Sequence, residues 1–269
     1  MTNPQIPYRF EVELEVPGSP DEVWQAIATA DGIGSWMMET DLDAHEGGAV
    51  TFHMGPEVES HGHVTAYEPS RRITYAEDWA TLVGHPGADV TPLVTEFLVE
   101  ARSGGTCVVR VVTSAFGTGA HWENEFWSEM TRGWEPMLDN LRLYMTHFRG
   151  DHATQLWATA TCGGTPETAI VALRDALGIE GVIGQSVTEH DLTGVVERTV
   201  ERHFLIRVER PLSGMLSFFS YDSGEGTTVQ LVGYLFGDDA ATYVVREQHA
   251  WCDWLAAATA GVTADSSSA

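Results

Sequence analysis

The sequence predicts an α+β protein of two tandem domains, each with a curved antiparallel sheet wrapped around a long C-terminal helix. Residues 18–33 recur in loose form at residues 164–179, at one constant offset and without a gap. In each half, a series of strand-like segments is followed by one long helical segment. The repeat is longer than any solenoid unit, so the repeating unit is a whole domain.

Each domain is expected to begin with a strand and a capped helix. Ser or Thr followed by Pro is typical of a helix N-cap and the first helical position. We expect the first domain at residues 1–150, a reduced second domain at residues 151–262 and a disordered tail at residues 263–269. The matched positions are Gly18/Gly164, Ser19/Thr165, Pro20/Pro166, Ala26/Ala172, Gly32/Gly178 and Ile33/Ile179.

In the first domain, residues 8–16 alternate between apolar and charged side chains, which predicts a half-buried strand. A helix capped by Ser19 follows, and a short second helix is expected at residues 32–37. Five later segments have the composition of strands, and the last two form a hairpin around a Gly-rich turn. These strands are expected at residues 49–54, 62–67, 72–77, 93–101 and 106–113.

A long helix at residues 120–148 is expected to close the first domain. Pro136 lies inside it and is expected to kink the helix or mark a local break. The helical pattern consists of apolar residues that recur every three or four positions, namely Trp122, Phe126, Met130, Trp134, Leu138, Leu141 and Met145.

The second domain repeats this order in reduced form, without the short second helix and the strand after it. Its capped helix is expected at residues 165–177 and its closing helix at residues 238–260. Its strands are expected at residues 156–162, 195–200, 203–209, 215–221 and 227–235.

The composition excludes several functions. The chain carries 39 acidic residues against 14 basic residues, all of them Arg, for a net charge of −25. This charge repels nucleic acid and anionic membranes, and the absence of Lys excludes a Lys Schiff base and a phosphate-loop Lys. No apolar run is long enough for membrane insertion and no secretory signal is visible, so a cytoplasmic protein is expected. The three scattered cysteines fit a reducing compartment.

Few residues show a pattern that carries chemistry. His45, His53, His61 and His63 gather in the first domain, but they form no metal-binding motif, so no metal is expected. Glu77, Asp78 and His121 flank aromatic segments, and each is a candidate general base if its surroundings tune its pKa. Glu125 and Glu129 are expected on the solvated face of the long helix. No phosphate loop or dinucleotide fingerprint is present, so no cofactor is expected.

Three segments of the first domain resemble the SRPBCC superfamily, also called START-like or helix-grip proteins. They are SPDEVWQAIATADGIGSW at residues 19–36, GHVTAYEPSRRITY at residues 62–75 and GWEPMLDNLRLYM at residues 133–145. Within the superfamily they are most similar to the homologues of the heat-shock-protein ATPase activator. The second domain departs from the pattern, with Ala169-Ile170 in place of Val23-Trp24, so it is expected to have a smaller cavity or a supporting role.

The resemblance implies an apolar cavity between the sheet and the long helix, and the aromatic helix of the first domain fits its wall. Met and aromatic side chains adapt to irregular apolar ligands. Plain core packing is the alternative reading of the same residues. The ligand-binding residues expected from the first domain are Trp36, Met38, Phe52, Met54, His63, Tyr75, Trp79, Phe97, Trp122, Phe126, Met130 and Trp134.

We therefore expect the first domain to bind a small hydrophobic or aromatic molecule, as a carrier or sensor. Two alternatives stay open because the fold does not fix the function. One is a polyketide aromatase/cyclase-like enzyme, so whether the chain catalyses a reaction is undecided. The other is a co-chaperone-like protein-interaction module. Formation of a homodimer also stays open.

Overall fold

The computed structural model describes residues 5–55, 58–189, 191–224 and 226–263. The chain divides into two compact units, Met1–Gly150 (unit 1) and Asp151–Ala269 (unit 2). Each unit has one antiparallel sheet and a long C-terminal helix, which confirms the predicted α+β class with two tandem helix-grip domains. The predicted tail lies outside the described residues, apart from Thr263.

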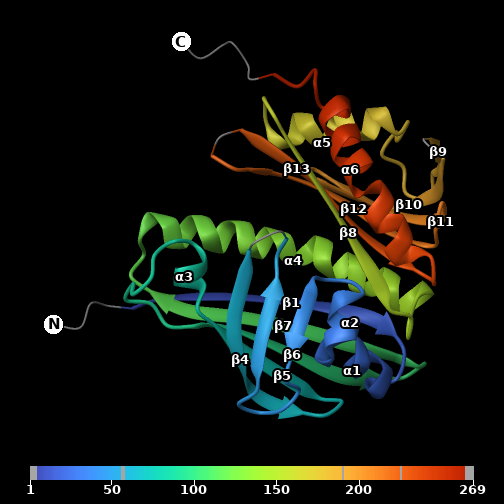
Figure 1. Ribbon diagram of the computed structural model, residues 1–269. Helices are drawn as coiled ribbons and strands as arrows, with labels where there is room; N and C mark the ends of the chain where they lie inside the picture. The colour runs from blue at the N-terminus through green and yellow to red at the C-terminus, as the bar shows by residue number, and fades with distance from the viewer. Residues whose placement is uncertain (1–4, 56–57, 190, 225, 264–269) are drawn as a thin grey trace. The chain divides into compact units, whose positions relative to one another are not determined.

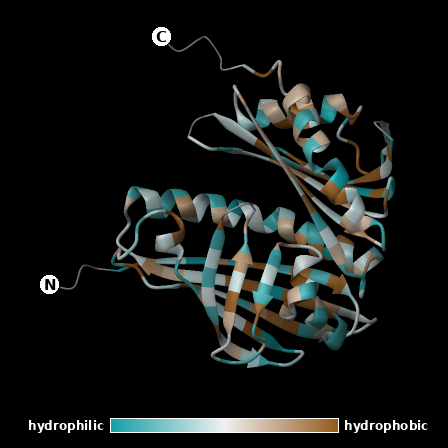
Figure 2. Cartoon of the chain, in the orientation of Figure 1, coloured by the Kyte–Doolittle hydropathy of each residue, from teal (hydrophilic) through white to brown (hydrophobic). Residues whose placement is uncertain are grey.

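Unit 1 contains a seven-stranded antiparallel sheet with the order β1-β7-β6-β5-β4-β3-β2 (Figure 1). Neighbouring strands follow each other in the sequence except for β1, which pairs with β7. Apolar and polar residues alternate along these strands, so one face of the sheet is available for a core (Figure 2). The strands are β1 (Ile6–Pro17), β2 (Glu39–Leu42), β3 (Ala49–His53), β4 (Glu59–Glu68), β5 (Arg72–Glu77), β6 (Leu93–Arg102) and β7 (Thr106–Gly117).

The helices of unit 1 are α1 (Pro20–Ala28), α2 (Ala30–Gly34), α3 (Trp79–Leu82) and α4 (His121–His147). The Ser19 side chain accepts from the Glu22 N–H and the Glu22 side chain accepts from the Ser19 N–H, which forms the capping box that starts α1. The predicted short helix begins two residues early, at Ala30, because Thr29 caps it. Helix α4 continues through Pro136 without a break, and most residues of its C-terminal half are buried.

A buried glutamate organises the turn before α4. Glu123 is only 1% exposed, and its carboxylate accepts hydrogen bonds from the N–H groups of Thr118 and Gly119, from the Thr118 hydroxyl and from the Tyr8 hydroxyl. A Cβ on Gly117 would lie 2.3 Å from Glu123 Oε2, so only glycine at this position lets the carboxylate lie so close to the backbone. Burial raises the pKa of the Glu123 carboxyl, but these hydrogen bonds outweigh burial and hold the pKa below its ordinary value.

Replacing Glu123 with glutamine is expected to lower the free energy of unfolding by about 2–3 kcal/mol at neutral pH, because an amide NH₂ would face N–H donors. The pKa of Glu123 is lower in the folded state, so its stabilisation is present above the unfolded pKa and is lost as pH falls through the folded pKa. Urea denaturation at neutral and acidic pH measures both effects. The control is Glu125→Gln on the exposed side of α4. Equal stability of the two variants at neutral pH contradicts the assignment.

Unit 2 contains a six-stranded antiparallel sheet with the order β8-β13-β12-β11-β10-β9. Its first helix, α5 (Pro166–Ala176), begins at a capping box formed by Thr165 and Thr168, and its last helix is α6 (Ala240–Ala258). Ala169 and Ile170 are fully buried in its core. The strands are β8 (Ala153–Cys162), β9 (Ser186–Glu189), β10 (Leu192–Val200), β11 (His203–Arg210), β12 (Gly214–Asp222) and β13 (Thr227–Phe236).

Candidate ligand-binding cavity

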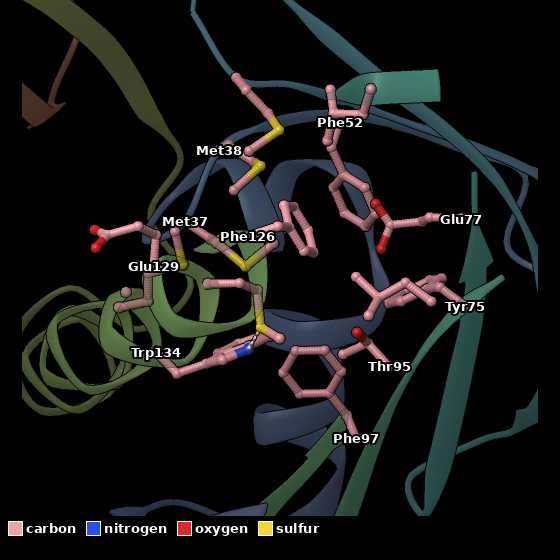
Figure 3. Close-up of a pocket in the computed structure, with 16 residues that line it drawn as sticks. Met37, Met38, Phe52, Tyr75, Glu77, Thr95, Phe97, Phe126, Glu129 and Trp134 are labelled. Carbon is pink, nitrogen blue, oxygen red and sulfur yellow. Dashed lines mark hydrogen bonds between the residues drawn. The ribbon is translucent and has the colours of Figure 1, made fainter. Parts of the chain in front are cut away.

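Unit 1 contains a cavity of about 360 Å³ between its sheet and helix α4. Its wall comes from β3, β5 and β6 on the sheet side, from α4 on the other, and from the segment between α2 and β2 (Figure 3). The lining residues are Met37, Met38, Phe52, Met54, Tyr75, Glu77, Leu82, Leu93, Thr95, Phe97, Phe126, Glu129, Met130, Gly133, Trp134 and Met137.

Aromatic side chains form a connected row along this wall. Phe52 and Tyr75 meet edge to face with ring centroids 5.5 Å apart, Tyr75 and Phe97 do so at 6.3 Å, and Phe97 and Trp134 at 5.7 Å. These edge-to-face contacts fix the ring orientations. The Trp134 indole N–H donates to the Met130 sulfur at 3.2 Å (Figure 3). The wall is therefore a set of rings held in place by one another.

Methionines supply the adaptable part of the wall. Five of the eight methionines in the chain line the cavity, namely Met37, Met38, Met54, Met130 and Met137. Their unbranched, polarisable side chains fit ligands of irregular shape. Met54 is 40% exposed, whereas the other four are buried or half-buried.

The hydroxyl group of Tyr75 is not available to a ligand, because it is already hydrogen-bonded. The Tyr75 hydroxyl donates to the backbone carbonyl of Ile27 at 3.2 Å. Burial raises the pKa of Tyr75, so the phenol stays neutral. Tyr75 therefore contributes the apolar part of its ring to the wall.

One carboxyl group faces the interior of the cavity. Glu77 ends β5, and the Ser60 hydroxyl donates to its Oε1 at 2.6 Å. Its side chain points toward the centre of the ring of lining residues, whereas that of Glu129 points away from it (Figure 3). Burial raises the pKa of Glu77 above its ordinary value, and the Ser60 hydrogen bond offsets only part of this effect.

A glycine in the middle of α4 leaves part of the cavity open. Gly133 lines the cavity, and a Cβ added to it would meet no atom within 4 Å. Glycine costs roughly 1 kcal/mol relative to alanine inside a helix. At this position the missing side chain enlarges the cavity.

Eight of the twelve residues predicted from the sequence line the cavity. They are Met38, Phe52, Met54, Tyr75, Phe97, Phe126, Met130 and Trp134. The other four lie elsewhere. Trp36 is fully buried in the core, where its indole N–H donates to the Ala26 carbonyl at 2.9 Å. His63 is exposed, because the alternation along β4 places Ser60 and Val64, but not His63, on the buried side.

Trp79 and Trp122 belong to a second aromatic cluster, in which Tyr8 of β1 packs near the first turns of α4. The Trp79 indole N–H donates to the Thr91 carbonyl at 2.8 Å, and Trp122 stacks on His85 with centroids 4.4 Å apart. Phe126 joins the two regions, since it lines the cavity and lies 4.9 Å from Trp79. These two tryptophans therefore pack the end of the domain and do not form the cavity wall.

The sequence patterns contain signals for several lining residues that were not predicted. Glu77 and Thr95 each lie two positions from a predicted lining residue on the same strand, so they share its face. Glu129, Gly133 and Met137 follow one another at intervals of four residues, about one helical turn each, so they share one face of α4. Met37 lies in an irregular segment and gives no such signal. The other lining residues that were not predicted are Leu82, Leu93 and Glu129. Glu129 is exposed, as expected for the solvated face of the long helix.

Two of the four gathered histidines lie beside carboxylates. His53 lies 3.0 Å from Asp41 and 3.2 Å from Glu59, and His61 lies 3.5 Å from Glu59. Among the described residues, no group of three His, Cys, Asp or Glu side chains could hold a metal ion. Within the same part of the chain, no helix is long and apolar enough to cross a membrane.

An antiparallel sheet packed on one long C-terminal helix, with an apolar cavity between them, defines unit 1 as a helix-grip domain of the SRPBCC class. Within this class, the family model described as Activator of Hsp90 ATPase homolog 1-like protein matches residues 17–146. This match covers most of unit 1 and confirms the resemblance seen in the sequence.

Several solved structures are similar to this chain at low sequence identity. Protein MLL2253 from Mesorhizobium loti is 18% identical, with a TM-score of 0.45, and the match covers 52% of this chain and 98% of that chain. The Aha1 dimer from Colwellia psychrerythraea is 17% identical, with a TM-score of 0.42, and covers 53% and 99%.

DynU16, a putative protein in the dynemicin biosynthetic locus, is 15% identical, with a TM-score of 0.42, and covers 94% and 97%. No curated protein matches the sequence.

Proposed function

We propose that unit 1 binds a small hydrophobic or aromatic molecule in its cavity and serves as a carrier or sensor for it. The observation that supports this proposal is an apolar cavity of about 360 Å³ with a wall of rings and methionines. This volume lies within the range of roughly 300–1,000 Å³ that is typical of ligand pockets. In this proposal the protein acts in the cytoplasm. A measurement of its molecular mass in solution tests whether it forms a homodimer.

Packing energy also favours a ligand. Side chains around an unfilled apolar space lose dispersion contacts that a filled core would make. Two large residues of the wall, Phe97 and Trp134, contact each other and both line the cavity. A bound apolar molecule restores those contacts and removes the wall from water.

A catalytic role has weaker support. Proton transfer within an aromatase/cyclase-like site would need two convergent titratable groups. Glu77 faces the cavity, but the Tyr75 hydroxyl is engaged by Ile27 and Glu129 points away. A co-chaperone-like module, by contrast, needs no unfilled interior. Binding without a reaction is thus the function that these residues support best.

The full chain is expected to bind about one equivalent of the neutral probe 1-ethylnaphthalene in equilibrium dialysis. Trp134→Ala is expected to weaken this binding at least tenfold, about 1.4 kcal/mol, because it removes one ring of the wall. The matched control is Trp127→Ala, on the same helix but outside the cavity wall. The proposal fails if the probe does not bind, or if the two variants weaken binding equally.

A further inference from the structure

The charged groups that line the cavity are all acidic. Glu77 and Glu129 are the two carboxylates among the lining residues, and none of the sixteen residues is Arg or His. The nearby Arg132 forms an ion pair with Glu129. The whole chain carries a net charge of −25, which raises the local concentration of cations. An anionic ligand would be repelled by these charges and would meet no cationic side chain among the lining residues.

Glu77 has one oxygen available to a ligand. Its Oε1 accepts from Ser60, and its other oxygen has no hydrogen-bond or ion-pair partner among the described residues. The carboxylate points into the cavity (Figure 3). A half-buried carboxylate without a cation beside it is electrostatically unfavourable, and a ligand ammonium group would supply the missing partner.

The rings around Glu77 suit the same kind of ligand. Phe52 and Tyr75 line the same cavity as Glu77, and Figure 3 draws their rings on the same side of the cavity as the Glu77 carboxylate. A cation over an aromatic face gains roughly 0.5–2 kcal/mol, and more when water is excluded. Further rings from Phe97, Phe126 and Trp134 complete the wall. A cavity that is lined by rings and by one carboxylate without a cationic partner suits an ammonium group.

From these observations, and given that unit 1 binds a ligand as proposed above, we infer that the preferred ligand is an apolar cation. It is a hydrophobic body that carries an amine or a quaternary ammonium group, and this group lies against Glu77. The aromatic rings and methionines hold the hydrophobic body. Glu77 is the specificity-determining residue of the cavity.

Three probes of similar size test this inference on the full chain by equilibrium dialysis at neutral pH. They are (naphthalen-1-ylmethyl)trimethylammonium, neutral 1-ethylnaphthalene and anionic 1-naphthylacetate. The ammonium is expected to bind at least tenfold more tightly than the neutral probe, about 1.4 kcal/mol, and the acid most weakly. Glu77→Gln is expected to abolish the preference for the ammonium, so that the ammonium and 1-ethylnaphthalene bind within about twofold of each other. The control Glu125→Gln removes one charge outside the cavity and is expected to keep the preference.

The outcomes separate the two claims. If none of the probes binds, the proposed function fails. If 1-ethylnaphthalene binds and the ammonium binds no more tightly, the proposed function stands and the cation inference is overturned. Tighter binding of the neutral ketone 1-acetylnaphthalene than of the ammonium also overturns it, since Glu77 would then act as a hydrogen-bond donor. The comparison of probes on the unaltered chain is decisive even if Glu77→Gln does not fold.

Discussion

Trp36→Ala is expected to lower the free energy of unfolding of unit 1 by about 3–5 kcal/mol, the range found when a large aromatic side chain is removed from a core. Trp36 is fully buried, and its indole N–H donates to the Ala26 carbonyl. The Asn140 side chain also donates to the Trp36 carbonyl at 3.3 Å, which connects this segment to α4. The loss is one of stability, because Trp36 does not line the cavity.

Urea denaturation followed by far-UV circular dichroism measures this effect. Trp36→Phe is the matched variant, since it keeps most of the buried volume and loses the hydrogen bond to Ala26, so a cost of about 1–2 kcal/mol is expected. An unchanged denaturation midpoint for Trp36→Ala, together with weaker binding of 1-ethylnaphthalene, would place Trp36 in the binding site and contradict this assignment.

Gly133→Leu is expected to weaken binding of 1-ethylnaphthalene by about 100-fold or more, equivalent to roughly 2.7 kcal/mol. The added side chain occupies space that the structure leaves open at the cavity wall. Leucine is a better helix former than glycine, so the free energy of unfolding is expected to stay the same or rise by up to about 1 kcal/mol. Binding is therefore expected to weaken without a loss of stability, which a general disruption of the fold cannot produce.

Ser128→Leu provides the control for this substitution. Ser128 lies on α4, is exposed and does not line the cavity, so the same addition there is expected to leave binding unchanged. Equilibrium dialysis and urea denaturation of both variants give the two readouts. Binding of the probe by Gly133→Leu at the level of the unaltered chain would show that the cavity is not the binding site.

Much of the cavity wall could be predicted because it follows regular periodicities. Tyr75 and Phe97 occupy inward positions on strands with a period of two. Phe126, Met130 and Trp134 recur at helical spacing on one face of α4. The capping box at Ser19 likewise predicts the start of α1 from a short local pattern.

The remaining features depend on contacts between distant segments. Trp36 and Met38 lie close together in the irregular segment after α2, and no periodicity indicates which of them enters the cavity. The helical pattern places Trp122 on the correct face, but its packing depends on Trp79. Trp79 lies in α3, a helix that the sequence patterns do not predict. The burial of Glu123 depends on the N–H groups of the turn at residues 117–119, which a helical wheel does not include.

Methionine-methyl NMR tests the central claim, that the cavity of unit 1 binds a small apolar molecule. The chain is labelled with ¹³C at the methionine methyl groups and titrated with 1-ethylnaphthalene. Chemical shifts are expected to change most at Met37, Met38, Met54, Met130 and Met137, which line the cavity. Met145, buried in the core of unit 1, and Met215, buried in unit 2, are expected to show little change. Absence of shift changes at the five cavity methionines, or changes centred on Met215, would contradict the claim.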